Sequence, residues 1–168
     1  YSADVHGNQI TGERLRCISR IINHSSTGEG VLTVVTTMDG IADRLIPVER
    51  FKEAVITLDY SSEIEPEKLA KKLVAMGFVR TGMVEDKGQF AIRGGIIDIF
   101  SYTDEAPVRI ELWDTEVDSI RMFDVESQRS IERLQSYSIF PATEYIFTED
   151  ELKNGLYNIK KECDRQLE

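Results

Sequence analysis

Residues 88–125, GQFAIRGGIIDIFSYTDEAPVRIELWDTEVDSIRMFDV, alternate apolar and charged side chains between turn residues. Successive side chains of a β-strand point to opposite faces of a sheet. Val108 and Ile110 can therefore share a buried face, while Arg109 and Glu111 are expected to point to solvent. The pattern predicts a β-sheet with one dry face.

Three residues interrupt this run side by side: Arg93, Gly94 and Gly95. Glycine tolerates backbone angles and close neighbours that other residues do not. A basic side chain beside two glycines indicates a bulge or a docking surface rather than more regular strand. We expect the function of the chain to lie at this surface.

The charge of the chain argues against one class of function. Its 168 residues include 30 acidic and 20 basic side chains, for a formal net charge of -10. Sequence-independent binding to nucleic acid takes most of its affinity from clustered positive charge. If nucleic acid is involved, we expect another part of a longer protein to hold it.

Cysteine usage and hydropathy indicate a cytoplasmic protein. Cys17 and Cys163 lie far apart, and neither has a Cys or His neighbour at metal-ligand spacing, so we interpret both as reduced structural thiols. No apolar stretch approaches the roughly 20 residues that a membrane-spanning helix needs, and no signal peptide is evident. Because the chain opens at Tyr1 and closes in a charged, helix-like stretch, we expect a fragment of a longer protein.

Residues 1–50 read as a partial α/β segment. Apolar residues at three- and four-residue spacing predict an amphipathic helix over 12–23. The β-branched run VLTVVTT at 31–37 predicts a strand covered on both faces, with its sheet partners outside this chain. A short helix is expected over 38–46, stopped by Pro47.

Residues 51–140 read as an α+β domain with an antiparallel sheet. A strand is expected over 54–60, and a helix over 65–76 covers one face of the sheet and ends at Gly77. The apolar stripe of that helix is expected to consist of Leu69, Leu73, Val74 and Met76. Residues 141–168 are expected to begin a following, helical domain.

The chain lacks the residue patterns of common catalytic sites. His6 and His24 are its only histidines, no serine lies in a GxSxG context, and no glycine-rich stretch has phosphate-loop spacing. Hairpin carboxylates that could in principle form a hydrolytic pair are expected to be solvated instead: Asp98, Glu111, Asp114, Glu116 and Asp118. We therefore predict no catalytic residue, cofactor or metal, and no enzymatic activity for this fragment.

Arg80 and Arg93 each lie in a strand-like segment beside apolar neighbours. One interpretation is that they point outward and pair with nearby carboxylates. The other is that they form a protein-docking patch, since arginine has a planar fork of five donors and is enriched at interfaces.

Phe100 could supply the aromatic part of such a patch, or it could belong to the core. Strand parity groups Phe100 with Ile92 and Ile96, and Arg93 with Ile97, unless the two glycines shift the register. Parity alone leaves both interpretations open.

Two long strings carry a resemblance to a known family. The string GQFAIRGGIIDIF, followed by PVRIELWDTEVDSIRMFDVESQRSIERL and IFPATEY, resembles the amino-terminal region of bacterial transcription-repair coupling factors, the Mfd family. That region is similar to the excision-repair protein UvrB. The resemblance covers nearly the whole chain and implies a UvrB-type UvrA-interaction domain over 51–140.

The resemblance implies an adaptor that recruits UvrA in nucleotide excision repair. The parent protein is expected to be an ATP-dependent DNA translocase that uses ATP and Mg²⁺, binds double-stranded DNA and displaces stalled RNA polymerase. Those regions are expected outside this chain. Two alternatives stay open: an intramolecular clamp that masks the docking face, and the corresponding region of a UvrB-like repair helicase.

The resemblance also implies which residues meet UvrA. In UvrB the contact uses arginines in the strands before and after a Gly-aromatic step, and these fall on Arg80 and Arg93. A further arginine of UvrB falls on Ala91, where this chain departs from the pattern. Phe100 is carried over as a third contact.

Overall fold

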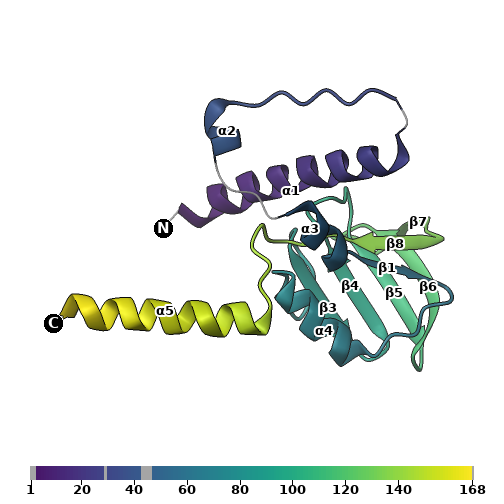
Figure 1. The fold of residues 1–168 in the computed structure, drawn as a ribbon. Coiled ribbons are helices and arrows are strands. Elements are labelled where there is room, and N and C mark those ends of the chain that lie inside the picture. The colour runs from purple at the N-terminus through teal and green to yellow at the C-terminus, as the bar shows by residue number, and fades with distance from the viewer. Residues whose placement is uncertain (1–2, 29, 43–46, 168) are drawn as a thin grey trace.

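The computed structural model describes residues 3–28, 30–42 and 47–167. Figure 1 shows a helix-covered sheet with a long amino-terminal helix above it and a long carboxy-terminal helix that extends away to the left. The helices are α1 (Ala3–Thr27), α2 (Met38–Ala42), α3 (Val48–Ala54), α4 (Pro66–Ala75) and α5 (Glu149–Leu167). The strands are β1 (Ile56–Asp59), β2 (Val79–Arg80), β3 (Gln89–Arg93), β4 (Ile96–Phe100), β5 (Val108–Trp113), β6 (Glu116–Phe123), β7 (Ser130–Arg133) and β8 (Ser136–Ile139).

The strands form one large and one small sheet. The large sheet has the order β2-β3-β4-β5-β6-β7, and its pairs are antiparallel except for the parallel pair β2–β3. The small sheet joins β1 to β8 in antiparallel fashion. The predicted α+β class with a mainly antiparallel sheet is confirmed, while the domain boundaries near residues 50 and 140 stay predictions.

Helix α4 covers one face of the large sheet, as predicted (Figure 1). Leu69 and Leu73 are buried there against Phe90, Ile97 and other apolar side chains of the sheet. The prediction was wrong for Val74, which is exposed. On a helix, the position after Leu73 is rotated by about 100° and turns away from the sheet.

The helix α4 ends where the sequence predicted. Pro66 occupies its first turn, where a missing N–H costs nothing, and Gly77 follows its end with a φ of +90°. A Cβ on Gly77 would lie only 2.7 Å from the Cβ of Thr143. Glycine is therefore required here by both backbone angle and space.

The Arg-Gly-Gly stretch forms a hairpin turn and not a bulge. Arg93 pairs with Ile96 across β3 and β4, and Gly94 has a φ of +60°, so Gly94 and Gly95 are the two turn residues. This turn sets the face on which each side chain lies. Arg93 consequently shares a face with Phe100, and not with Ile97 as simple parity predicted.

The run at 31–37, predicted as a buried strand with its sheet partners outside this chain, forms no strand within it. These residues adopt no regular secondary structure, and Val31 and Val35 are 93% and 91% exposed. A strand exists only through hydrogen bonds to a neighbouring strand. No described residue pairs with 31–37, so its β-branched composition alone cannot form a sheet.

Helix α1 includes the predicted 12–23 helix and is longer at both ends. Leu15 and Ile22 on its buried face pack with Phe51 of α3. The helix expected after the 31–37 run begins at Met38, but residues 43–46 of that prediction lie outside the described part of the chain.

The charged carboxy-terminal helix is confirmed as α5. In Figure 1 it extends away from the sheet, and Leu156 and Ile159 on it are exposed. Cys17 on α1 and Cys163 on α5 are both free thiols, as expected, and both are exposed. Within the described ranges, no helix is long and apolar enough to cross a membrane.

Candidate protein-docking site

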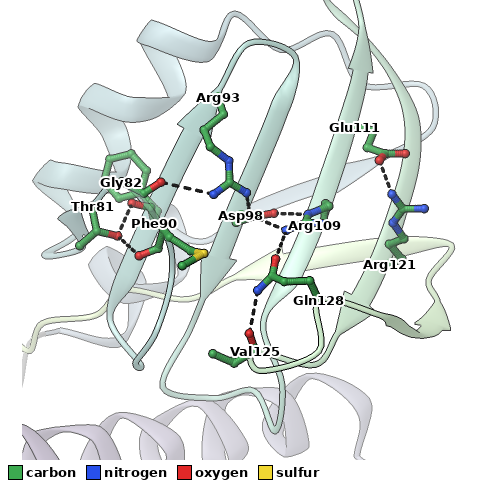
Figure 2. Close-up of polar contacts among 11 residues, drawn as sticks. Thr81, Gly82, Phe90, Arg93, Asp98, Arg109, Glu111, Arg121, Val125 and Gln128 are labelled. Carbon is green, nitrogen blue, oxygen red and sulfur yellow. Dashed lines mark hydrogen bonds and ion pairs between the residues drawn. The ribbon is translucent and has the colours of Figure 1, made fainter.

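Arg93 ends strand β3, and two contacts hold its guanidinium over the sheet (Figure 2). Its NH2 donates to the Oδ2 of Asp98 at 2.6 Å, and its NH1 donates to the carbonyl of Gly82 at 3.3 Å. The Arg93 side chain is still 40% exposed. Arg93 is therefore placed by the protein and remains open to a partner.

Asp98 is the buried centre of this arrangement. Its side chain is 1% exposed, and it lies opposite Arg109 on the neighbouring strand β5. Arg109 donates from Nε to Oδ1 at 2.6 Å and from NH2 to Oδ2 at 2.8 Å. The expectation that the hairpin carboxylates are solvated was wrong for Asp98, because two guanidiniums replace its water.

Arg109 was expected to point to solvent, and this was also wrong. Its side chain is only 13% exposed, and its guanidinium carbon lies 4.3 Å from the centre of the Phe123 ring. Hydrogen bonding to Asp98 raises the pKa of Arg109, so its positive charge is secure. The sequence alone did not show that Asp98 lies beside Arg109 and allows it to be buried.

Glu111 is likewise paired rather than free in solvent. It forms an ion pair with Arg121 on strand β6 (Figure 2). It also accepts a hydrogen bond from Ser119 at 2.8 Å. Its side chain is 29% exposed. Cross-strand pairing therefore engages both charged residues that the alternating pattern assigned to solvent.

Gln128, in the loop after β6, binds Arg109. Its Oε1 accepts a hydrogen bond from Arg109 NH2 at 2.8 Å, and its Nε2 donates to the carbonyl of Val125 at 2.7 Å. We call Arg93, Asp98, Arg109 and Gln128 the Arg93 cluster. With two arginines and one aspartate, it carries one positive charge in excess.

Arg80 lies on edge strand β2 and is 46% exposed. It pairs in register with Phe90, whose ring packs in the core beneath α4. On that side Arg80 donates from NH2 to the Oε1 of Glu67 on α4 at 3.2 Å. Such an exposed ion pair is easily exchanged for a partner's carboxylate.

The two predicted arginines lie near the same edge of the sheet but on opposite faces. Arg80 shares the face of Phe90, whereas Arg93 is three residues beyond Phe90 and lies on the other face with Asp98. Gly82, two residues after Arg80, accepts the hydrogen bond from Arg93. A partner that meets both arginines must therefore wrap around the β2 edge.

Phe100 shares the face of Arg93 but is buried. It packs in a small separate core with Val84 and Ala91, and the Lys87 ammonium lies 5.3 Å from the centre of its ring. Ala91 is also buried, so a longer side chain there would have to displace Val84 or Phe100. The departure from UvrB at Ala91 thus coincides with a filled site.

The residues considered for catalysis stay apart. His24 lies near the end of α1, where a ring nitrogen lies 3.2 Å from the carbonyl of Gly30, and the side chain of His6 lies outside the described part. Among the described residues, no three His, Cys, Asp or Glu side chains gather as a metal site. What the geometry offers is a partly exposed guanidinium, suited to a carboxylate or carbonyl group on another protein.

Comparison with known proteins decides the family of this domain. The sequence profile of the UvrB interaction domain family matches residues 56–145, more than half of the chain. The chain belongs to the UvrB interaction domain family. The matched residues of this UvrB interaction domain include both sheets, helix α4 and the whole Arg93 cluster.

The relatives that match this chain are transcription-repair-coupling factors. The chain is 44% identical to that of Bacillus subtilis (strain 168) over 151 residues, 90% of this chain. It is 38% identical to that of Staphylococcus aureus (strain MRSA252) over 95% of this chain, and 40% identical to that of Staphylococcus haemolyticus over 87%. The matched region spans only 12% to 14% of the length of these relatives.

Sequence reasoning missed the two residues that place Arg93 in this UvrB interaction domain. Asp98 was considered only as a possible catalytic carboxylate, and Arg109 only as a solvated side chain. One signal was available, because Asp98 is the single charged residue within the apolar run IIDIF. A carboxylate in such a run is buried only when it is paired.

Proposed function

We propose that this chain is a protein-docking module that recruits UvrA in transcription-coupled nucleotide excision repair. Membership of the UvrB interaction domain family and similarity to transcription-repair-coupling factors support the proposal. Arg80 and Arg93 are the proposed contacts, because both guanidiniums are partly exposed along the β2 edge.

The observation that carries the proposal is the excess positive charge of the Arg93 cluster on an acidic chain. Arg109 already balances the charge of Asp98, so the charge of Arg93 is available to a partner. A local basic site on a chain of net charge -10 orients an encounter with a complementary surface. UvrA would meet it with carboxylates or backbone carbonyls.

Phe100 is the third proposed contact, and it differs from the arginines in being buried. A partner would reach its ring only after Lys87 moves aside. The proposed first contact is therefore through the arginines, with Phe100 engaged once the partner has docked.

The activity of the parent protein is proposed to reside outside these residues. Since the chain spans about an eighth of the length of its relatives, ATP-driven DNA translocation and displacement of RNA polymerase would belong to the remainder. ATP, Mg²⁺ and double-stranded DNA would bind there as well. We propose that the chain itself is no enzyme and needs no cofactor to dock.

Calorimetric titration of the chain with purified UvrA tests the proposal. Arg80→Ala and Arg93→Ala are each expected to weaken binding about tenfold, a loss of about 1.4 kcal/mol. Alanine is preferred to glutamate at position 93, because Arg93→Glu would place a second carboxylate beside the buried Asp98. Circular dichroism verifies that each variant is folded.

Arg133→Ala provides a matched control. Arg133 is exposed on β7, at the edge of the sheet opposite β2, so its loss removes the same charge from a distant site. Its affinity for UvrA is expected to equal that of the unmodified chain. An unchanged affinity of the Arg80→Ala/Arg93→Ala variant would refute the site, and no binding by the unmodified chain would refute the function.

A further inference from the structure

We propose that Asp98 is a positioning residue for docking: held in place by Arg109, it orients the guanidinium of Arg93 toward the partner before the partner arrives. This role rests on the proposed function. The Asp98 side chain is buried, so it would act on recognition through Arg93 and not by touching the partner itself.

Strand register brings these side chains together. Asp98 lies in the middle of β4, directly between Ala91 on β3 and Arg109 on β5. Arg93 is two residues beyond Ala91 on the same face, a diagonal distance that a long side chain can bridge. The small side chain of Ala91 lets Arg93 reach across it to Asp98.

Arg109 and Arg93 bind Asp98 in different ways. Arg109 is buried and engages both carboxylate oxygens of Asp98, at 2.6 and 2.8 Å, which fixes the plane of the carboxylate. Arg93 takes a single short bond to Oδ2 at 2.6 Å. The N–H groups of Arg93 that bind neither Asp98 nor the Gly82 carbonyl therefore stay available to a partner.

Without Asp98, little in the described structure would hold Arg93. Its other hydrogen bond goes to the carbonyl of Gly82, at a longer 3.3 Å and from an exposed loop. An arginine side chain that is free before binding loses rotamer freedom when it binds, which lowers affinity. A side chain already placed by Asp98 avoids most of that loss.

The second contact of Arg109 extends the positioning to the loop after β6. Gln128 accepts from Arg109 NH2 at 2.8 Å and donates to the carbonyl of Val125 at 2.7 Å (Figure 2). The ring of Phe123 supports the guanidinium of Arg109 at 4.3 Å. Arg109 is thus held on several sides, and Asp98 with it.

A double-mutant cycle measured by titration with UvrA tests this role. Arg93→Ala is expected to weaken binding about tenfold in the unmodified chain, the effect of a loss near 1.4 kcal/mol. In an Asp98→Asn background the same change is expected to weaken binding less than about threefold, because Arg93 is no longer placed. Asp118→Asn, an exposed carboxylate on β6, is the control background, in which the full tenfold effect should persist.

Asp98→Asn leaves Arg109 buried without its carboxylate and can fail to fold. In that case the background becomes Asp98→Asn/Arg109→Gln, in which no charge is left buried. The expected cycle is the same, because the neutral amide that replaces Asp98 holds Arg93 only weakly. Urea denaturation establishes that the background used is folded.

A second measurement needs no partner. The NH1 and NH2 signals of Arg93 in ¹H–¹⁵N spectra of the chain are expected to be separate, because Asp98 and Gly82 restrict rotation of the guanidinium, and to merge into the averaged signal of a free arginine after Asp98→Asn. A purely structural role for Asp98 would lower stability in urea without this change in a folded variant.

The outcomes separate the two proposals. If UvrA binds and Arg93→Ala costs the same tenfold in both the unmodified and the Asp98→Asn chains, Asp98 has no positioning role, while the proposed function stands. If the unmodified chain does not bind UvrA, the proposed function fails and this role of Asp98 fails with it.

Discussion

Asp98 and Arg109 face each other across strands β4 and β5 and share two hydrogen bonds, Nε to Oδ1 at 2.6 Å and NH2 to Oδ2 at 2.8 Å. Both side chains are largely removed from water. In this setting the pair is costly to break but not required to be ionic, since apolar side chains of similar volume often replace such pairs without loss.

Arg109→Met is expected to lower the free energy of unfolding by about 3 kcal/mol. The variant leaves the charge of Asp98 buried, with Arg93 as its remaining ion-pair partner. Adding Asp98→Leu to Arg109→Met is expected to recover most of that loss, since no buried charge remains. Urea denaturation of the single and double variants measures both values. A double variant less stable than either single variant would contradict this view of the pair.

Glu67→Gln is expected to change the free energy of unfolding by less than about 1 kcal/mol, because its ion pair with Arg80 is exposed at a 3.2 Å separation. Urea denaturation at low and high NaCl measures the effect, which should shrink further at high salt. Comparison with Arg109→Met tests whether burial decides how much an ion pair contributes to the free energy of unfolding of this sheet. Equal losses for the two variants would show that it does not.

Gly95→Ala is expected to destabilise the β3–β4 hairpin by about 1 to 3 kcal/mol, the usual cost of overpacking. A Cβ at Gly95 would lie 2.9 Å from the backbone carbonyl oxygen of Leu112 on β5. Gly82→Ala is the control, because a Cβ there would have no neighbour within 4 Å. Thermal denaturation compares the two, and equal melting temperatures would show that the close approach to Leu112 carries no cost.

Asp104→Asn is expected to stabilise the chain near pH 7. Burial raises the pKa of the Asp104 carboxyl above its ordinary value, and hydrogen bonds from Tyr137 at 2.5 Å and Thr103 at 3.1 Å offset only part of that rise. The folded chain therefore binds this proton more tightly than the unfolded chain does. The stabilising effect is complete below the unfolded pKa of about 3.9 and is lost as the pH rises through the raised folded value.

The gain from Asp104→Asn should consequently shrink as the pH is lowered from 7 toward 4. Urea denaturation across that range measures it, and Asp118→Asn controls for the loss of one negative charge from the chain. A gain that stays constant over the range would contradict the raised pKa of Asp104.

Local patterns predicted most of the elements. The alternation of Val108 to Trp113 and the end of α4 before Gly77 each depend on residues a few positions apart, and the structure has both. Such signals act within one strand or one helical turn, so they can be read without knowing the rest of the fold.

Pairing between distant segments could not be predicted in the same way. The β-branched run at 31–37 has every local property of a strand, yet its residues are exposed because no described residue pairs with them. Parity left the face of Arg93 open, and the structure decides it because Gly94 and Gly95 close the hairpin and reset the parity of β4 relative to β3.

Residue patterns were enough to establish the α+β class, the helix-covered sheet and the two candidate arginines, Arg80 and Arg93, and the family resemblance favoured docking as their role. The folded arrangement was needed to show that these arginines lie on opposite faces of one edge and that Asp98 and Arg109 are buried together. The physical reason is that the environment of a charged side chain is set by its cross-strand neighbours. Which residues become neighbours depends on register, a property of the assembled sheet and not of any single strand.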